Sequence, residues 1–178
     1  RTMGTAFTVK VVGRGSISPE RQEAFEAAIA EALEAVDASM STWREDSELS
    51  RLNRAGTEPQ PASVQLRAVL LEAERTAKIS GGAFDVTVGP LVNAWGFGPD
   101  KAAEPPDEAT LAALRERVGY QRLELDAAAG TVRKARADVY VDLSAIAKGY
   151  AVDRVAGALE QLGFEHYMVE LGGEIRVL

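Results

Sequence analysis

Lys148 combines a charged side chain with a position near the start of a predicted helix. The segment before it, Val139–Leu143, alternates apolar residues with Tyr140 and Asp142, the period expected of a strand. From Ile146 onward, apolar residues return at close to helical spacing, which puts Lys148 within about the first turn. The helix dipole disfavours a cation there, whereas a bound phosphate would be attracted by both the ammonium and the helix N–H groups. A phosphate-binding lysine and a solvated surface lysine are equally compatible with this segment.

The stretch from Gly81 to Gly98 holds five glycines and three aromatic residues within 18 positions. Glycine allows a backbone to approach a ligand closely, and aromatic rings supply flat apolar walls. Asp85, which follows Phe84, could accept hydrogen bonds from a base or a ribose. Together with Lys148 these features indicate a phosphate-bearing aromatic ligand. Taken in isolation, the stretch is explained equally well as a tightly turned core segment.

Other candidate residues are less specific. Trp43 could be a platform for a planar ligand, but composition alone favours an anchor in the core. Neither G-x-G-x-x-G nor G-x-x-x-x-G-K-[ST] occurs. Scattered acids such as Asp142 and Glu174 could bind a divalent metal through oxygen, although most of the 27 acidic residues are expected to be solvated. His166, the single histidine, is expected at a strand start on the surface.

Composition excludes several classes of function. The chain has 178 residues, 46% of them hydrophobic, which is enough for one domain with a real core. A net charge of -7 disfavours nonspecific binding to nucleic acid or to anionic membranes. The absence of cysteine from the sequence excludes thiol catalysis, disulfides and thiolate metal sites.

The elements that would position these residues mix helices and strands without a regular βαβ order, so the predicted class is α+β. Asp142 and Ser144 are predicted to cap the helix that carries Lys148. Val64 is predicted to face the core from a helix that Ser63 caps and Gly81-Gly82 ends. Other strands are predicted around Phe7–Val11, Leu123–Leu125, Thr131–Arg133, His166–Leu171 and Glu174–Leu178, and other helices follow Ser18, Asp46 or Ser47, and Asp107.

Five segments, in order along nearly the whole chain, resemble the ApbE family of FAD:protein FMN transferases. The segments are Met3-Gly-Thr, Met40–Asn53 (MSTWREDSELSRLN), Gly81–Gly98 (GGAFDVTVGPLVNAWGFG), Asp142–Asp153 (DLSAIAKGYAVD) and Val169–Arg176 (VELGGEIR). The resemblance implies one domain over residues 1–178, with a mixed or antiparallel sheet packed against several helices in an ApbE-like, T-fold-like arrangement.

The resemblance also implies an activity. The expected enzyme cleaves the pyrophosphate of FAD, with magnesium, and attaches FMN to a threonine or serine of an acceptor flavoprotein. Lys148 is implied as a catalytic residue, and the carbonyl of Ala145 as a magnesium ligand. The implied FAD contacts are Met3, Trp43 (usually tyrosine in the family), Ala83, Phe84, Asp85, Asp142 and Lys148.

The family pattern continues beyond Leu178 for about another domain, with a T-S-G segment, an H-x-x-D-P segment, and a later Asp and Thr that complete the metal site. The chain is therefore expected to be the N-terminal portion of the enzyme. Hydrolysis of FAD to FMN and AMP, and flavin binding without catalysis, are the alternatives. Family members are commonly exported, so a periplasmic location is expected, with anchoring to the inner membrane as a lipoprotein.

Overall fold

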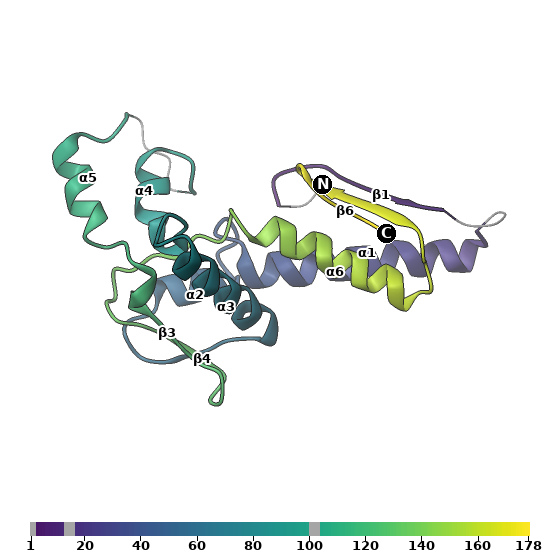
Figure 1. The fold of residues 1–178 in the computed structure, drawn as a ribbon, viewed down its shortest axis with the longest axis horizontal. Coiled ribbons are helices and arrows are strands. Elements are labelled where there is room, and N and C mark those ends of the chain that lie inside the picture. The colour runs from purple at the N-terminus through teal and green to yellow at the C-terminus, as the bar shows by residue number, and fades with distance from the viewer. Residues whose placement is uncertain (1–2, 13–16, 100–103) are drawn as a thin grey trace. The chain divides into compact units, whose positions relative to one another are not determined.

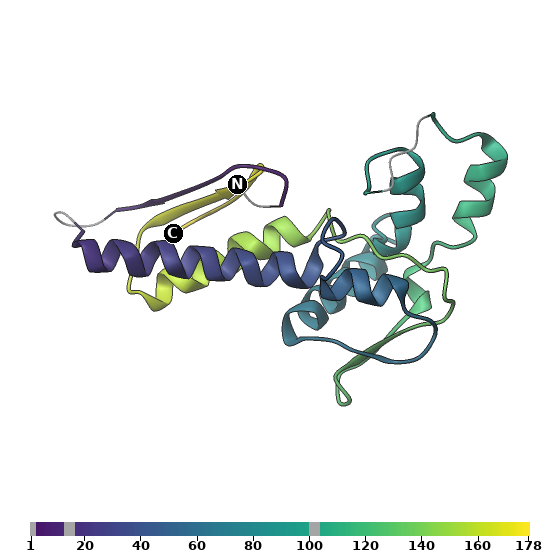
Figure 2. The same cartoon turned by 180° about the vertical axis from the view of Figure 1, so that it is seen from behind.

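The computed structural model describes residues 3–12, 17–99 and 104–178. The chain divides into two compact units, one formed by residues 1–38 and 146–178 and the other by residues 39–145 (Figures 1 and 2). Both sheets of the structure are antiparallel, and helices accompany each of them, which confirms the predicted α+β class. Among the described residues, no helix combines the length and the apolar character needed to cross a bilayer.

The first unit consists of a three-stranded sheet and two helices. Its strands follow the order β1-β5-β6, with Val9 opposite Val169 and Leu171 opposite Glu174. Inward residues of β5 are buried, whereas Ile175 on β6 is 63% exposed. Both views show the two helices running along one face of this sheet (Figures 1 and 2). The elements are β1 (Phe7–Val11), α1 (Pro19–Met40), α6 (Ala147–Gln161), β5 (Tyr167–Leu171) and β6 (Glu174–Val177).

The second unit holds short helices around a small sheet of order β2-β4-β3. Local capping explains the starts of α2, α3 and α5, because the side chains of Ser47, Ser63 and Asp107 each accept a backbone N–H from the first turn, as predicted. The elements are α2 (Glu48–Arg54), β2 (Gln60–Pro61), α3 (Val64–Ile79), the 3₁₀ turn η1 (Val86–Val88), α4 (Gly89–Ala94), α5 (Glu108–Arg115), η2 (Tyr120–Arg122), β3 (Leu123–Asp126) and β4 (Thr131–Lys134).

The prediction that Val64 faces the core is wrong. Its side chain is 71% exposed. The buried residues of α3 are Leu66, Val69, Leu70, Ala73 and Ala77, the i, i+3, i+4, i+7 stripe of one helix face. Val64 lies two positions before this stripe begins, which turns its side chain away from that face.

The strand predicted over Val139–Leu143 is also wrong, although the alternation of burial behind it is real. Val139, Val141 and Leu143 are fully buried, yet the segment belongs to neither sheet. The side chain of Asn53 occupies the place of a neighbouring strand, since its amide donates to the carbonyl of Val141 (2.8 Å) and its oxygen accepts from the N–H of Val141 (2.8 Å). The alternation of apolar and polar residues correctly predicts that the apolar side chains are buried, but it does not determine which group the backbone binds.

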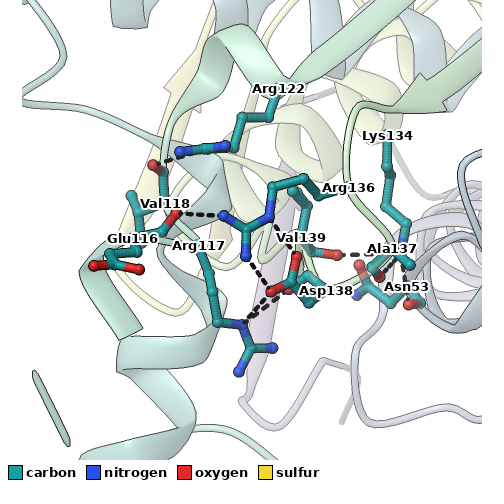
Figure 3. Close-up of polar contacts among 10 residues, drawn as sticks. All are labelled: Asn53, Glu116, Arg117, Val118, Arg122, Lys134, Arg136, Ala137, Asp138 and Val139. Atoms are coloured by element: carbon teal, nitrogen blue, oxygen red, sulfur yellow. Dashed lines mark hydrogen bonds and ion pairs between the residues drawn. The ribbon is translucent and has the colours of Figure 1, made fainter. Parts of the chain in front are cut away.

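Lys134, the last residue of β4, also holds this segment (Figure 3). Its ammonium is fully buried and donates to the carbonyls of Asn53 (2.8 Å), Ala137 (2.9 Å) and Val139 (3.1 Å). An ammonium has three N–H donors, so all three are satisfied. Burial lowers the pKa of Lys134, and the negative charge of Asp138 opposes that shift.

The pKa of Lys134 predicts a specific dependence of stability on pH. Between its lowered value in the folded protein and about 10.5, only the unfolded chain binds this proton, so the free energy of unfolding rises with pH, by at most about 1.4 kcal/mol per pH unit. Replacing Lys134 by Met should remove this rise. Denaturant unfolding across that pH range, on the wild type and Lys134→Met, measures it. Identical slopes for the two proteins would contradict the prediction.

Candidate functional site

The start of α6 lacks the cap that the sequence predicted. The Asp142 carboxylate accepts from the N–H of Ser144 (2.7 Å) and so closes a turn before the helix. Three residues of turn follow, and α6 begins only at Ala147. A capping side chain reaches the second or third N–H after it, so Asp142 and Ser144 lie too early in the chain. Ile146 is the N-cap residue of α6, and among the described residues no side chain makes a capping hydrogen bond to this helix start.

Lys148 is the second residue of α6 and its side chain is half-buried. The N–H of Tyr150 donates to the carbonyl of Ile146 (3.1 Å), which makes it the first amide with an acceptor in this helix. The amides of Ala147, Lys148 and Gly149 therefore face outward from an uncapped helix start. An ammonium beside these amides is the arrangement that the sequence associated with a bound phosphate.

The loop that holds Met3 lies beside Lys148 through the turn between β5 and β6. The N–H of Gly172 donates to the carbonyl of Ala6 (3.3 Å). A Cβ atom built on Gly172 would lie 2.9 Å from Thr5 Cγ2 and 3.4 Å from Lys148 Cδ. Met3 itself has a positive φ of 49°, unusual for a residue other than glycine. In the first unit, Gly172 thus lies against both Lys148 and the segment that follows Met3.

Asp85 occupies a fixed position in the second unit. One carboxylate oxygen accepts from the N–H (2.8 Å) and the hydroxyl (2.6 Å) of Thr87, and the other accepts from the N–H of Tyr120 (2.7 Å). The buried Thr87 hydroxyl also accepts from the N–H of Gly119 (2.7 Å). A carboxylate has about four acceptor positions, so roughly one remains for a ligand. Asp85 is therefore a structural cap of η1 as well as a candidate FAD contact.

Asp142 lies next to the segment that contains Asp85. The N–H of Asp142 donates to the carbonyl of Val86 (2.8 Å), and the Asp142 side chain is only 6% exposed. Ala83 is exposed and Phe84 is half-buried, both directly after the left-handed Gly81-Gly82 turn that ends α3. The second unit thus gathers four of the predicted contacts, Ala83, Phe84, Asp85 and Asp142, along two adjoining pieces of backbone.

The exposure of Trp43 decides between its two interpretations, an anchor in the core and a platform for a planar ligand. Trp43 is 60% exposed, so it does not anchor its loop in the core. The loop is held instead by the hydroxyls of Ser47 (2.5 Å) and Ser50 (3.2 Å), which both donate to the carbonyl of Ser41. Trp95 and Phe97 are also exposed, at 50% and 78%. These rings are available to a ligand or partner and contribute little to the core.

The residues that the structure describes do not by themselves form a metal site. Within residues 3–12, 17–99 and 104–178, no group of three or more His, Cys, Asp or Glu side chains is arranged to hold a metal ion. Ala145 is exposed and can offer one carbonyl oxygen. Magnesium prefers near-octahedral coordination by oxygen, which one carbonyl cannot supply. The described residues do not make a complete magnesium site.

A separate apolar cavity of about 430 Å³ lies in the first unit, between β1 and α1. It is lined by Phe7, Val9, Phe25, Ile29 and Leu33, with Glu26 and Glu34 at charged positions. None of the predicted site residues lines it. Its volume is therefore no evidence for the ligand that the sequence indicates.

The model of the ApbE family matches residues 3–178. The chain belongs to the ApbE family. Proteins named FAD:protein FMN transferase from Haemophilus influenzae and Vibrio cholerae are 48% and 44% identical to it over 99% of the chain. This chain spans about half the length of these curated relatives, 52% of each.

Solved ApbE structures share the fold. The Vibrio cholerae flavin transferase ApbE (H257G mutant) superposes with a TM-score of 0.92 at 44% identity, covering 99% of this chain and 60% of that one. The apo flavinyl transferase ApbE of Pseudomonas stutzeri gives a TM-score of 0.90 at 35% identity, over 99% of this chain and 58% of that one. The ApbE-like fold expected from the sequence is confirmed.

Three residues that shape the site went unnoticed in the sequence: Lys134, Asn53 and Gly89. Lys134 follows the inward-facing Val132 by two positions in β4, so a period of two places a lysine inside the unit. Gly89 allows a close approach, because a Cβ there would lie 2.2 Å from the ring of Tyr140. Only the first of these signals can be read from the sequence, since the other two depend on tertiary neighbours.

Gly172 is predicted to be essential to the placement of the Met3 loop. Gly172→Ala forces a left-handed φ of +56° on a residue with a side chain and brings Cβ within 2.9 Å of Thr5. We expect a loss of about 1–2 kcal/mol in the free energy of unfolding and a shifted NMR signal of the Thr5 methyl group.

Gly173→Ala is the matched control, because φ is also positive (+101°) but its Cβ would meet nothing within 4 Å. This variant should lose stability without moving the Thr5 signal. Equal Thr5 shifts in the two variants would show that the contact with Gly172 does not place this loop.

Proposed function

We propose that the natural protein transfers FMN from FAD to the hydroxyl of a threonine or serine in an acceptor flavoprotein. The observation that carries this proposal is the match of 99% of the chain, at 48% identity, to a protein named FAD:protein FMN transferase. The uncapped start of α6 with Lys148 in its first turn supports it, because the reaction needs a place for phosphate.

The proposed reaction is a displacement at phosphorus. The acceptor oxygen forms a bond to the phosphorus of the FMN half of FAD, and the bond from that phosphorus to the bridging oxygen breaks, so AMP leaves. The hydroxyl proton passes to a base that the described residues do not identify. Charge grows on the pyrophosphate as the bridging bond breaks, and Lys148 with the outward amides of α6 is suited to stabilise it.

The other predicted residues are assigned to FAD binding. Trp43 and Phe84 offer aromatic faces to a flavin or an adenine, and Asp85 has roughly one acceptor position left for a ring N–H or a hydroxyl. Met3, Ala83 and Asp142 complete the proposed FAD contacts. These assignments rest on the family resemblance together with the exposure and hydrogen bonds of each residue.

Magnesium and location belong to the proposal too. We propose that Ala145 supplies one carbonyl ligand to magnesium, and that residues outside the described part of the chain supply the others. A periplasmic, lipid-anchored protein is proposed from the family resemblance alone. Mass spectrometry of an acceptor peptide after incubation with FAD tests the activity: covalently attached FMN supports transfer, whereas free FMN and AMP alone would show hydrolysis.

Lys148 should matter for transfer and not for folding. Without an anion, its charge opposes the helix dipole, so Lys148→Gln should leave the free energy of unfolding unchanged or raise it by a few tenths of a kcal/mol. In the natural protein, the same change should strongly reduce FMN transfer, because the charge that develops on the pyrophosphate loses a partner. Affinity for riboflavin, which has no phosphate, should hardly change.

Lys78→Gln is the matched control, since Lys78 lies on the exposed side of α3 in an ion pair with Glu74 (2.5 Å). Melting temperature, transfer rate and affinities for FAD and riboflavin are measured on both variants. Normal transfer by Lys148→Gln at saturating FAD and magnesium would remove Lys148 from the catalytic assignment.

A further inference from the structure

We propose that Lys134 is a positioning residue for the ligand site: with Asn53, it fixes the extended segment 137–143 and thereby the place of Asp142. The inference rests on the proposed function, in which Asp142 contacts FAD. Lys134 itself is fully buried and touches no ligand. Lys134, Asn53 and the segment all belong to the second unit.

The ammonium of Lys134 joins two separate parts of that unit (Figure 3). One acceptor, the carbonyl of Asn53, belongs to α2, and the other two, the carbonyls of Ala137 and Val139, belong to the segment that leads to Asp142. All three acceptors are backbone carbonyls. The side chain therefore fixes the course of the backbone, because a shift at any of the three positions would break a buried hydrogen bond.

Asn53 adds a second attachment one residue further along. Its side-chain amide makes two hydrogen bonds to Val141, both of 2.8 Å, in the way a neighbouring strand would. The next residue is Asp142, whose N–H donates to Val86 and whose carboxylate accepts from Ser144. Alternate residues from Ala137 to Val141 are thus held by side chains, and Asp142 follows directly from them.

A charged residue is an unusual choice for this position. A buried ammonium without a contacting carboxylate costs desolvation energy, which its three carbonyl acceptors offset, and an apolar side chain of similar volume would leave those carbonyls without this donor. The nearby Asp138 carboxylate is bound by Arg136 (2.9 and 2.7 Å) and lies 3.8 Å from Arg117. Lysine at this position therefore imposes a backbone geometry that an apolar residue cannot impose.

Two variants and a stability control test this inference in the natural protein. Lys134→Met removes the three hydrogen bonds with little change in volume, and Asn53→Ala removes the two bonds to Val141. Leu70→Ala, in the buried face of α3, destabilises the same unit and removes none of the five hydrogen bonds made by Lys134 and Asn53. Backbone amide exchange at residues 139–144 and FAD affinity are measured under conditions where each variant is folded, together with kcat and KM for FAD.

We expect exchange at residues 139–144 to accelerate at least tenfold more in Lys134→Met and Asn53→Ala than in Leu70→Ala, whose effect reports the general loss of stability of the unit. FAD affinity should fall at least tenfold in the two former variants and less than threefold in the control, with KM rising more than kcat falls. Should Lys134→Met fail to fold, Asn53→Ala decides.

The inference is overturned if both variants bind FAD as well as Leu70→Ala does, or if exchange at residues 139–144 is unchanged. A different result would show that the proposed function itself is wrong. If the wild type does not bind FAD, that function is wrong and the role of Lys134 towards FAD falls with it. Exchange at residues 139–144 then still decides whether Lys134 holds the segment.

Discussion

The candidate site depends on a buried hydrogen-bond arrangement that replaces a strand. Lys134 and the side chain of Asn53 hold the backbone of residues 137–141 by two hydrogen bonds from an ammonium, which also binds the carbonyl of Asn53, and two from an amide. A strand in a sheet would have its backbone groups paired along its whole length. Here the pairing ends at Asp142, and the chain is free to turn at Ser144 and begin a helix at Ala147.

The end of the backbone pairing at Asp142 explains why the amides at the start of α6 lack a cap. Because Asp142 closes the preceding turn, it cannot cap the helix, and the outward amides of Ala147, Lys148 and Gly149 remain available. Glycine also allows chain segments to approach each other closely at two places. Gly89 makes room for Tyr140 beside the held segment, and Gly172 makes room for Thr5 and Lys148 in the first unit. At each of these two positions, the absence of a side chain lets a neighbouring segment lie closer than alanine would allow.

Sequence reasoning succeeded where the cause of a structure is local. The caps Ser47, Ser63 and Asp107 were predictable because each binds an N–H three residues away. The segment Val139–Leu143 was assigned as a strand because alternation reports burial, whereas the identity of its partner, a single side chain 88 residues away, is a tertiary fact. Lys134 was missed although the period of two in β4 places it inside the unit. The roles proposed for Met3 and Ala145 came from the family resemblance alone. For Trp43 the sequence left a core anchor and a ligand platform open, and the resemblance favoured the platform.

The central claim is that the phosphates of FAD bind at the outward amides of α6. Amide hydrogen exchange of the natural wild-type protein, saturated in turn with FAD and with riboflavin, tests it most directly. The proposal predicts that FAD slows exchange at residues 147–149 and that riboflavin, which lacks phosphate, leaves them unchanged. Unaltered exchange at these residues with FAD bound, or equal protection by riboflavin, would contradict it.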